Sequence, residues 1–289
     1  HPLYYLIFFF FLNIVLDLIF CGGFRLGVEF AALATVISQL LSVILCLIRL
    51  IRTKDVYQVN VREIRFDWTL LKQIIHQGLP SGMQNSIISI ANMVVQSNIN
   101  SFGKMAMAGC GAYSKIEGFG FLPITCFAMA MTTFIGQNLG AREFDRVKKG
   151  ARFGILCGVG LAEAVGIGIN LFIPQLIALF DRTPEVIQFG VTQAKIVTLF
   201  YFLLSFSHVI AGIMRGAGKS MVPMLVMLIS WCLIRITYVT ITIHFIPDIR
   251  VVFWAYPMTW TISSIIFLIY YKKADWIHYF DRQEEKQCA

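Results

Sequence analysis

The chain has 289 residues, of which 57% are hydrophobic and only 14% are charged, with a formal net charge of +8. Its mean hydropathy is +0.73. A soluble globular domain carries about 25% charged residues, so this composition excludes an ordinary soluble enzyme or binding domain. The seven cysteines form no CxxC pair and the five histidines form no HExxH motif, which argues against a disulfide framework and a zinc site.

The charged residues are clumped, and the apolar stretches between them are long enough to cross a bilayer, whose core needs about 20 helical residues. Because these stretches lack the alternation of a membrane barrel, they predict helices. The fold class is therefore an all-α polytopic membrane protein with about eight transmembrane helices. The predicted spans are Leu3–Cys21, Phe30–Ile48, Pro80–Phe102, Gly118–Gly140, Phe153–Phe180, Val186–Met214, Met221–Phe245 and Val251–Tyr271.

The first span contains an amide and a carboxylate, Asn13 and Asp17, which lie four residues apart on one helical face. An aspartate at a helix centre costs about 2.5–3.5 kcal/mol on insertion scales, and such residues usually serve a function. Alternatively, Asp17 lies close enough to the interface to be hydrated, because Cys21–Gly23 follow within two turns. We favour the functional interpretation, since Asn13 supplies a second oxygen. The second span adds the hydroxyl of Thr35, which alone would bond to its own helix.

The longest connection follows the second span and contains Asp67–Gln77, which has the pattern of an amphipathic helix at the membrane surface. This connection separates two spans from a block of six. We therefore predict four parts: two helices in residues 1–51, a cytoplasmic linker in 52–77, a six-helix lobe in 78–273 and a cytoplasmic tail in 274–289.

The third span is uncharged but carries a polar stripe at helical spacing. The stripe consists of Asn85, Ser89, Asn92 and Gln96. These side chains either bond to neighbouring helices or line a watery cavity. Four polar groups in line exceed what helix association usually needs, so we predict that they line a substrate cavity.

The later spans carry six further ionisable residues, namely Glu117, Glu163, Lys195, His208, Arg235 and His244. Glu117 lies near a predicted span end, where we expect it to be hydrated. Arg235 lies mid-span and needs a partner, for which Glu163 is one candidate. His208 is as well explained by helix packing as by proton transfer.

Lysine and arginine alternate between the connections: fifteen lie in the even-numbered loops and the tail, and four in the odd-numbered loops. The positive-inside rule then places both ends of this chain in the cytoplasm, in a multi-pass protein of the cell (inner) membrane. A nucleic-acid partner would need a basic face on a folded domain, and none is predicted. The partner that composition indicates is the lipid bilayer.

One motif resembles a nucleotide-binding loop. The stretch RGAGKS, residues 215–220, matches the end of GxxxxGK[ST], but Ile213 occupies the place of the first glycine and no soluble strand precedes it. Nucleotide hydrolysis is therefore not predicted, and no clustered histidines and carboxylates indicate another enzyme.

Six stretches together resemble the multidrug and toxic compound extrusion (MATE) transporter family. They occur in the family's order and are NIVLD (13–17), GVEFAALATVISQ (27–39), GLPSGMQNS (78–86), AYSKIEGFGFLP (112–123), FIGQNLGA (134–141) and RGAGKS (215–220). The resemblance implies twelve helices in two six-helix lobes, of which this chain would supply helices five to twelve. Residues 1–51 would be the last two helices of the first lobe, and a chain that begins without Met would be a fragment that cannot transport alone.

The resemblance also implies roles for residues. Some relatives bind their coupling ion, H⁺ or Na⁺, in the first lobe, at positions that Asn13, Asp17 and Thr35 match. Another branch uses carboxylates in the second lobe, where this chain has Ile88 and Leu204. We therefore expect coupling through the first lobe, no cofactor besides the ion, small organic cations or drugs as substrates, and a monomer when full length.

The predicted function is a secondary active antiporter that exports drugs or organic cations by alternating access, not an enzyme. The alternative is a lipid-linked oligosaccharide flippase of the related fold, which needs a more cationic cavity than Lys195 and Arg235 provide. A purely structural membrane subunit is a third possibility, against which the polar groups of the first and third spans argue.

Overall fold

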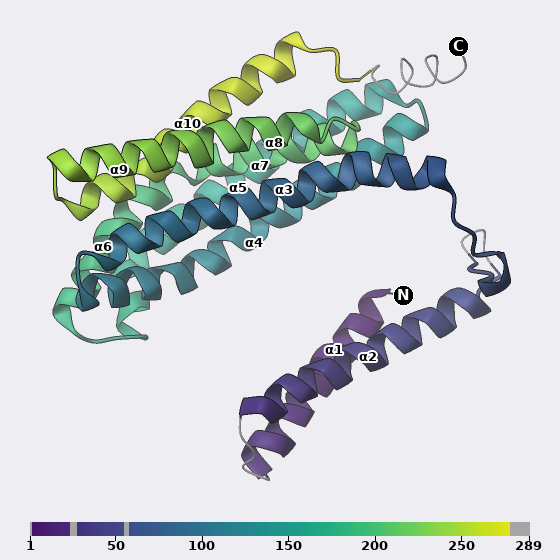
Figure 1. Cartoon of the computed structure of the whole chain (residues 1–289), viewed down its shortest axis with the longest axis horizontal. Helices are drawn as coiled ribbons and strands as arrows, with labels where there is room; N and C mark the ends of the chain where they lie inside the picture. The colour runs from purple at the N-terminus through teal and green to yellow at the C-terminus, as the bar shows by residue number, and fades with distance from the viewer. Residues whose placement is uncertain (1, 24–27, 55–57, 278–289) are drawn as a thin grey trace. The chain divides into compact units, whose positions relative to one another are not determined.

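The computed structural model describes residues 2–23, 28–54 and 58–277, and these residues form helices and no strand (Figure 1). The chain divides into two compact units, His1–Trp68 and Thr69–Ala289. Among these described residues, seven helices are long and apolar enough to cross a membrane: Tyr4–Gly23, Glu29–Arg52, Lys104–Gly140, Phe144–Ala178, Pro184–Gly216, Met221–Phe245 and Ile249–Lys273. The protein is thus an all-α polytopic membrane protein of about eight helices, the eighth being the more polar α3.

The first unit is a pair of helices that pack against each other, α1 (Pro2–Asp17) and α2 (Val28–Arg52) (Figure 1). A π-helical turn, Leu18–Gly23, continues α1 directly after Asp17. Ala34 and Ser38 are the fully buried residues of α2, and their small side chains allow close approach of a neighbouring helix. Most other side chains of the pair are apolar and exposed, as suits contact with lipid.

The second unit begins with three long helices, α3 (Trp68–Asn100), α4 (Lys104–Gly140) and α5 (Phe144–Ala178). The next rod joins α6 (Pro184–Val197) to α7 (Tyr201–Gly216) through a 3₁₀ turn. The following rod joins α8 (Met221–Met227) to α9 (Arg235–Phe245) through a π-helical segment, Leu228–Ile234, and α10 (Ile249–Lys273) ends the unit. In the centre of the unit, α4 packs against α5, α6 and α7.

The region after α2 differs from the sequence prediction. Asp67–Gln77 does not form a separate surface helix, because α3 begins at Trp68 and continues through Pro80 to Asn100 without a break. Likewise, α4 begins at Lys104, well before the predicted span start at Gly118. Hydropathy locates the apolar part of a helix, whereas the helix itself continues through polar turns whose backbone bonds are satisfied internally.

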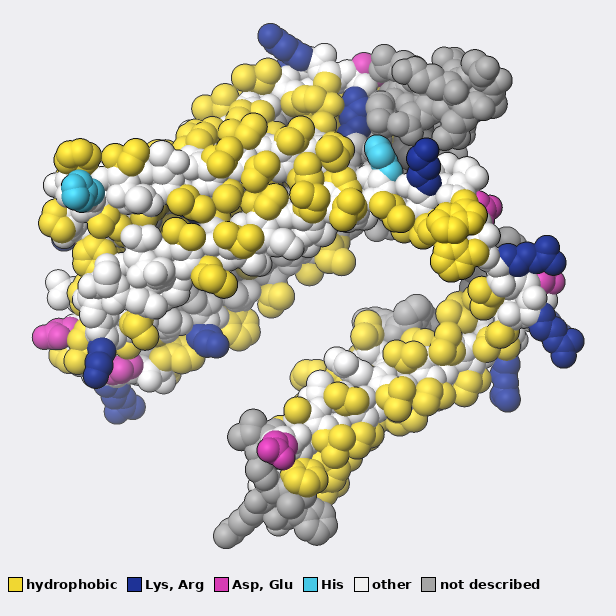
Figure 2. Space-filling model, in the orientation of Figure 1, with side chains coloured by type: hydrophobic (Ala, Val, Ile, Leu, Met, Phe, Trp, Pro, Cys, Tyr) yellow, Lys and Arg dark blue, Asp and Glu magenta, His cyan; other side chains and the backbone are white. Residues whose placement is uncertain are grey.

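Figure 2 shows hydrophobic side chains along the helices of the visible face and lysines and arginines near helix ends. Phe119, Leu156 and Leu179 are examples of large apolar residues that are more than 70% exposed. In water such a surface would aggregate, whereas in a bilayer it contacts acyl chains.

Glycines bring the central helices of the second unit close together. A Cβ atom at Gly212 of α7 would overlap the backbone carbonyl of Ala128 on α4. Gly109 of α4 and Gly190 of α6 face each other in the same way, and a Cβ on either would overlap the other's helix. Lipid provides no hydrophobic driving force between helices, so close van der Waals packing of this kind holds the unit together.

We predict that Gly212→Ala lowers the thermal unfolding temperature of the purified protein in detergent, because overpacking costs about 1–3 kcal/mol. Gly160→Ala is the matched control, since a Cβ at this helical glycine meets no atom within 4 Å. Alanine favours a helix over glycine by up to about 1 kcal/mol, so the control should unfold at the same temperature or higher. Equal unfolding temperatures for the two variants would contradict this account of the packing.

Candidate functional site

The first unit brings two of its three predicted site residues together. Asn13 Nδ2 of α1 donates a hydrogen bond to Thr35 Oγ1 of α2 at 3.2 Å. Thr35 in turn donates to the carbonyl oxygen of Ala31 at 3.1 Å, within its own helix. The Thr35 hydroxyl therefore accepts one hydrogen bond and donates another, and its oxygen retains one unused lone pair.

Asp17 is the last residue of α1 and lies one turn beyond Asn13. Its side chain is half-buried, and Oδ1 has less than 1 Å² of accessible surface and no hydrogen-bond partner among the described residues. Asp17 makes no hydrogen bond to Asn13 or Thr35, so the carboxylate is not part of their hydrogen-bonded pair. A buried carboxylate oxygen without a donor is costly, and ionisable residues within membrane helices are candidate functional residues.

The π-helical turn that follows Asp17 is a further feature that sequence inspection missed. Such turns are rare and often occur at functional sites, because they break the i to i+4 pattern of backbone bonds. Here the turn lies directly after the carboxylate. The adjoining Cys21-Gly22-Gly23 stretch is the signal that could have indicated an irregular helix end.

The polar stripe of α3 lies on one exposed face of the second unit. The adjoining face of α3 is buried through Gln84, Ala91, Val95 and Ile99. Of the four stripe residues, Asn92 is bonded to another helix, by Arg235 Nη1 at 3.4 Å. Ser89 donates to the carbonyl of Asn85 and Gln96 Nε2 to Asn100 Oδ1, both within α3. Bonding to neighbouring helices therefore accounts for Asn92 but leaves the other three available.

Arg235 is a fully enclosed charge within the second unit, at 1% exposure. It follows the π-helical segment directly, and its Nε and Nη2 donate to Thr259 Oγ1 at 3.3 and 2.9 Å. Its guanidinium lies over the rings of Trp231 and Tyr256, at 5.1 and 4.7 Å from their centroids. These contacts are with neutral groups, and cation–π contacts of this kind strengthen when they are desolvated.

The predicted partner of Arg235 was wrong. Glu163 accepts a hydrogen bond from the backbone nitrogen of Phe202 at 3.0 Å instead. The carboxylate whose charge acts on Arg235 is Glu117, which lies inside α4 and is half-buried rather than at a hydrated helix end. No hydrogen-bond partner of Glu117 occurs in the part of the chain that the structure describes. The two residues lie far apart in the sequence, so no local pattern could pair them.

The RGAGKS turn has a structural role. Gln77 donates to the carbonyl of Gly218, Ser220 donates to Gln77, and Arg215 Nη1 donates to Gln84 Oε1 at 3.3 Å. Gly218 has φ +75°, a conformation that favours glycine. The motif therefore anchors α3 to the turn after α7.

Three other polar side chains are held by contacts between or within the helices. His208 Nδ1 lies 3.1 Å from the carbonyl oxygen of Leu204, and its ring contacts those of Phe121 and Trp231. The buried hydroxyls of Tyr113 and Tyr201 bond to each other at 3.1 Å. For His208, these contacts favour the helix-packing interpretation over proton transfer.

This arrangement can be compared with known proteins. The MatE family model matches residues 80–241, more than half of the chain. The chain belongs to the MatE family.

Two relatives in the MatE family are named for drug resistance. The chain is 28% identical over 275 residues to a probable multidrug resistance protein, YpnP, of Bacillus subtilis, covering 95% of this chain and 61% of the relative. It is 30% identical over 225 residues to the probable multidrug resistance protein NorM of Thermotoga maritima, covering 76% of this chain and 48% of the relative. The chain thus spans about half to three fifths of the length of these relatives.

The fold also matches a solved structure of a MOP superfamily transporter from Pyrococcus furiosus, whose authors describe a binding pocket of reversed polarity. The TM-score is 0.86 at 23% sequence identity, covering 93% of this chain and 61% of that one. At this level of identity the match shows the fold alone.

We predict that Arg235→Lys lowers the thermal stability of the purified protein by about 2 kcal/mol. A lysine ammonium cannot bond to Thr259 through two nitrogens while it stacks on two rings, because it lacks the planar guanidinium. Arg182→Lys, an exposed position in the turn before α6, is the matched control and should leave stability unchanged. If both variants unfold like the parent, the enclosed guanidinium does not hold α9 to α10.

Proposed function

We propose that this chain serves in a secondary active antiporter, which exports small organic cations or drugs in exchange for H⁺ or Na⁺ by alternating access. The observation that carries the proposal is the buried, partnerless Oδ1 of Asp17 beside the Asn13–Thr35 hydrogen bond. The names of the multidrug resistance relatives support the same function for the family to which the chain belongs.

The oxygen atoms of the first unit suit the coupling ion. Asp17 offers a carboxylate, Asn13 an amide oxygen whose nitrogen is already engaged, and Thr35 a hydroxyl with one free lone pair. Hard cations prefer such oxygen ligands, and a proton needs the carboxylate alone. No cofactor besides the ion is required by this proposal.

Neutralisation of Asp17 would then drive the conformational step. An ionised carboxylate in a poorly hydrated site is costly, and a bound proton or Na⁺ removes that cost. The π-helical turn after Asp17 is the segment where α1 has the least regular bonding, so α1 would bend or repack there. Rocking of one bundle against another is the general motion of such transporters.

The substrate would meet the polar stripe of α3. Asn85, Ser89 and Gln96 are exposed on the second unit and are not bonded to another helix among the described residues. Amide and hydroxyl dipoles next to exposed Met83 and Met93 give an adaptable wall, which suits promiscuous binding of amphipathic cations.

The protein would act as a monomer in the cell (inner) membrane with both ends of this chain cytoplasmic, as the distribution of lysine and arginine indicates. A lipid-linked oligosaccharide flippase is a weaker alternative. Such a cavity needs free cations for the diphosphate, and Arg235 is enclosed by neutral groups. Accumulation of ethidium, with and without an ionophore, distinguishes drug export from lipid flipping.

We predict that Asp17→Asn abolishes gradient-driven ethidium efflux in the gene product that contains these 289 residues. The amide cannot take up a proton or balance a cation, so the gradient loses its coupling group. Efflux is measured in membrane vesicles, and membrane insertion is checked by the amount of folded protein extracted. Glu185→Gln, an exposed acid at the start of α6, is the control and should keep full activity. Full activity in Asp17→Asn would refute the coupling role.

A further inference from the structure

The α6–α7 rod is interrupted near its middle, at Thr198–Phe200, although its sequence contains no helix breaker there. The rod extends from Pro184 to Gly216, and no proline or glycine lies between Gly190 and Gly212. Kinks without such residues arise where a side chain inserts into the backbone hydrogen-bond ladder. The cause of the break therefore lies in a neighbouring helix.

The inserted side chain is that of Glu163 on α5. Its Oε2 accepts a hydrogen bond from the backbone nitrogen of Phe202 at 3.0 Å. In a continuous helix this nitrogen would donate to the carbonyl of Thr198, four residues earlier. The carbonyl of Thr198 instead accepts a bond from the backbone nitrogen of Tyr201. Glu163 thus replaces one acceptor of the helical ladder, and it forms no ion pair within the described residues.

Two further residues of α5 contact the same segment. Asn170 Nδ2 donates a hydrogen bond to Thr198 Oγ1 at 2.9 Å. Gly166 lies against the break, because a Cβ atom there would lie 2.6 Å from the carbonyl oxygen of Thr198. Spacings of three and four residues place Glu163, Gly166 and Asn170 on one face of α5. A single helical face therefore contacts the break at three points.

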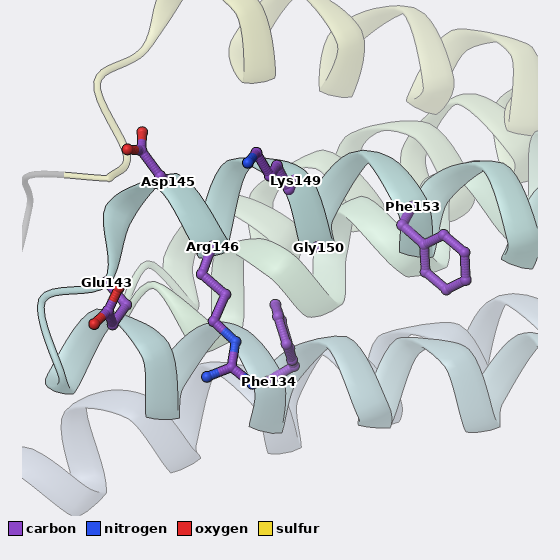
Figure 3. Close-up of a pocket in the computed structure, with 7 residues that line it drawn as sticks. All are labelled: Phe134, Glu143, Asp145, Arg146, Lys149, Gly150 and Phe153. Atoms are coloured by element: carbon purple, nitrogen blue, oxygen red, sulfur yellow. The ribbon is translucent and has the colours of Figure 1, made fainter.

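The helix α5 can support the break because it packs closely against α4. A Cβ atom at Gly150 would overlap the ring of Phe134, and one at Gly154 would overlap the side chain of Met131. Figure 3 shows the first of these contacts, beside a pocket of about 510 Å³ at the start of α5. Close backbone packing of this kind fixes α5 against α4, whereas the interrupted rod can change at its break.

The backbone of the rod departs from a helix at Phe200. Thr198 and Tyr201 have helical dihedral angles, whereas Phe200 has φ −115° and ψ 15°. A rotation at Phe200 to helical angles would return the nitrogen of Phe202 to the carbonyl of Thr198. Tyr201 would then donate to the residue four positions before it. Straightening the rod thus exchanges backbone hydrogen bonds, and the group that loses its donor is the carboxylate of Glu163.

We propose that this break is a hinge of the second unit and that Glu163 holds it bent. While Glu163 accepts the N–H of Phe202, the rod is bent; when this N–H returns to Thr198, the rod becomes one continuous helix. A carboxylate without a donor is costly at mid-membrane, so the bent form is the resting one. Hinges of this kind need a few residues that absorb a change in dihedral angles, and here Phe200 does so.

Trp254 of α10 reports the state of the hinge, because its ring lies 5.9 Å from that of Phe200 between centroids. The test uses the purified gene product that contains these residues, in nanodiscs and labelled with fluorotryptophan. The fluorine resonance of Trp254 is identified by its loss in Trp254→Phe. We expect Glu163→Ala to shift this resonance, because straightening moves the Phe200 ring, while the unfolding temperature stays close to the parent's. Glu163→Gln retains an acceptor oxygen and should keep the parent's resonance.

Two further variants complete the test. Asn170→Ala removes the second polar contact to the break and should shift the Trp254 resonance in the same direction as Glu163→Ala. Glu185→Ala changes an exposed acid of α6 and should shift nothing. An unshifted resonance in Glu163→Ala, or an equal shift in Glu185→Ala, would overturn the proposal. Loss of folded Glu163→Ala protein would also overturn it, since the freed N–H would then have regained no backbone acceptor. The readout needs neither substrate nor ion, so it is independent of the role proposed for Asp17.

Discussion

Hydrocarbon cannot hydrogen-bond, so every polar group within the membrane needs a partner from the protein, and this constraint determines most of the structure. It requires helices throughout, and it explains why glycines such as Gly212 bring helix backbones close together. It also explains the enclosure of Arg235. Its guanidinium donates hydrogen bonds to the Thr259 hydroxyl and the Asn92 amide oxygen and lies over two aromatic rings. Among the described residues, five buried side-chain atoms lack a hydrogen-bond partner, and Asp17 Oδ1 is the one of these five that belongs to an ionisable group.

Arg235 and Asp17 therefore differ in whether their polar atoms have hydrogen-bond partners. Arg235 is satisfied by neutral groups from several helices, so it stabilises the second unit and is a poor candidate for a moving charge. Asp17 Oδ1 lacks such partners, so under the proposed function a proton or cation would supply the missing partner. Both residues adjoin a π-helical segment, Leu18–Gly23 or Leu228–Ile234. In both cases an irregular stretch of helix adjoins an ionisable side chain. The two side chains differ because Arg235 has hydrogen-bond partners on other helices, whereas Asp17 Oδ1 has none among the described residues.

Sequence patterns predicted what depends on local composition. The charge-free runs located the membrane helices, and the common helical face of Asn13 and Asp17 suggested a polar site where Asn13 indeed bonds to Thr35. Patterns failed where partners lie far apart along the chain. Arg235 donates a hydrogen bond to Asn92 across 143 positions, and Arg215 donates one to Gln84 across 131 positions. The continuity of α3 through Pro80 also went unpredicted, because its polar residues resemble a linker when read by hydropathy alone.

The central claim is that Asp17 takes up the coupling cation. Infrared difference spectroscopy of the purified gene product tests it most directly, by recording carboxyl bands on acidification and on addition of Na⁺. The account predicts a carboxylate band that changes with one of these cations, disappears in Asp17→Asn and persists in Glu185→Gln. An unchanged difference spectrum in Asp17→Asn would contradict it, because the responding carboxylate would then be another residue, such as Glu117.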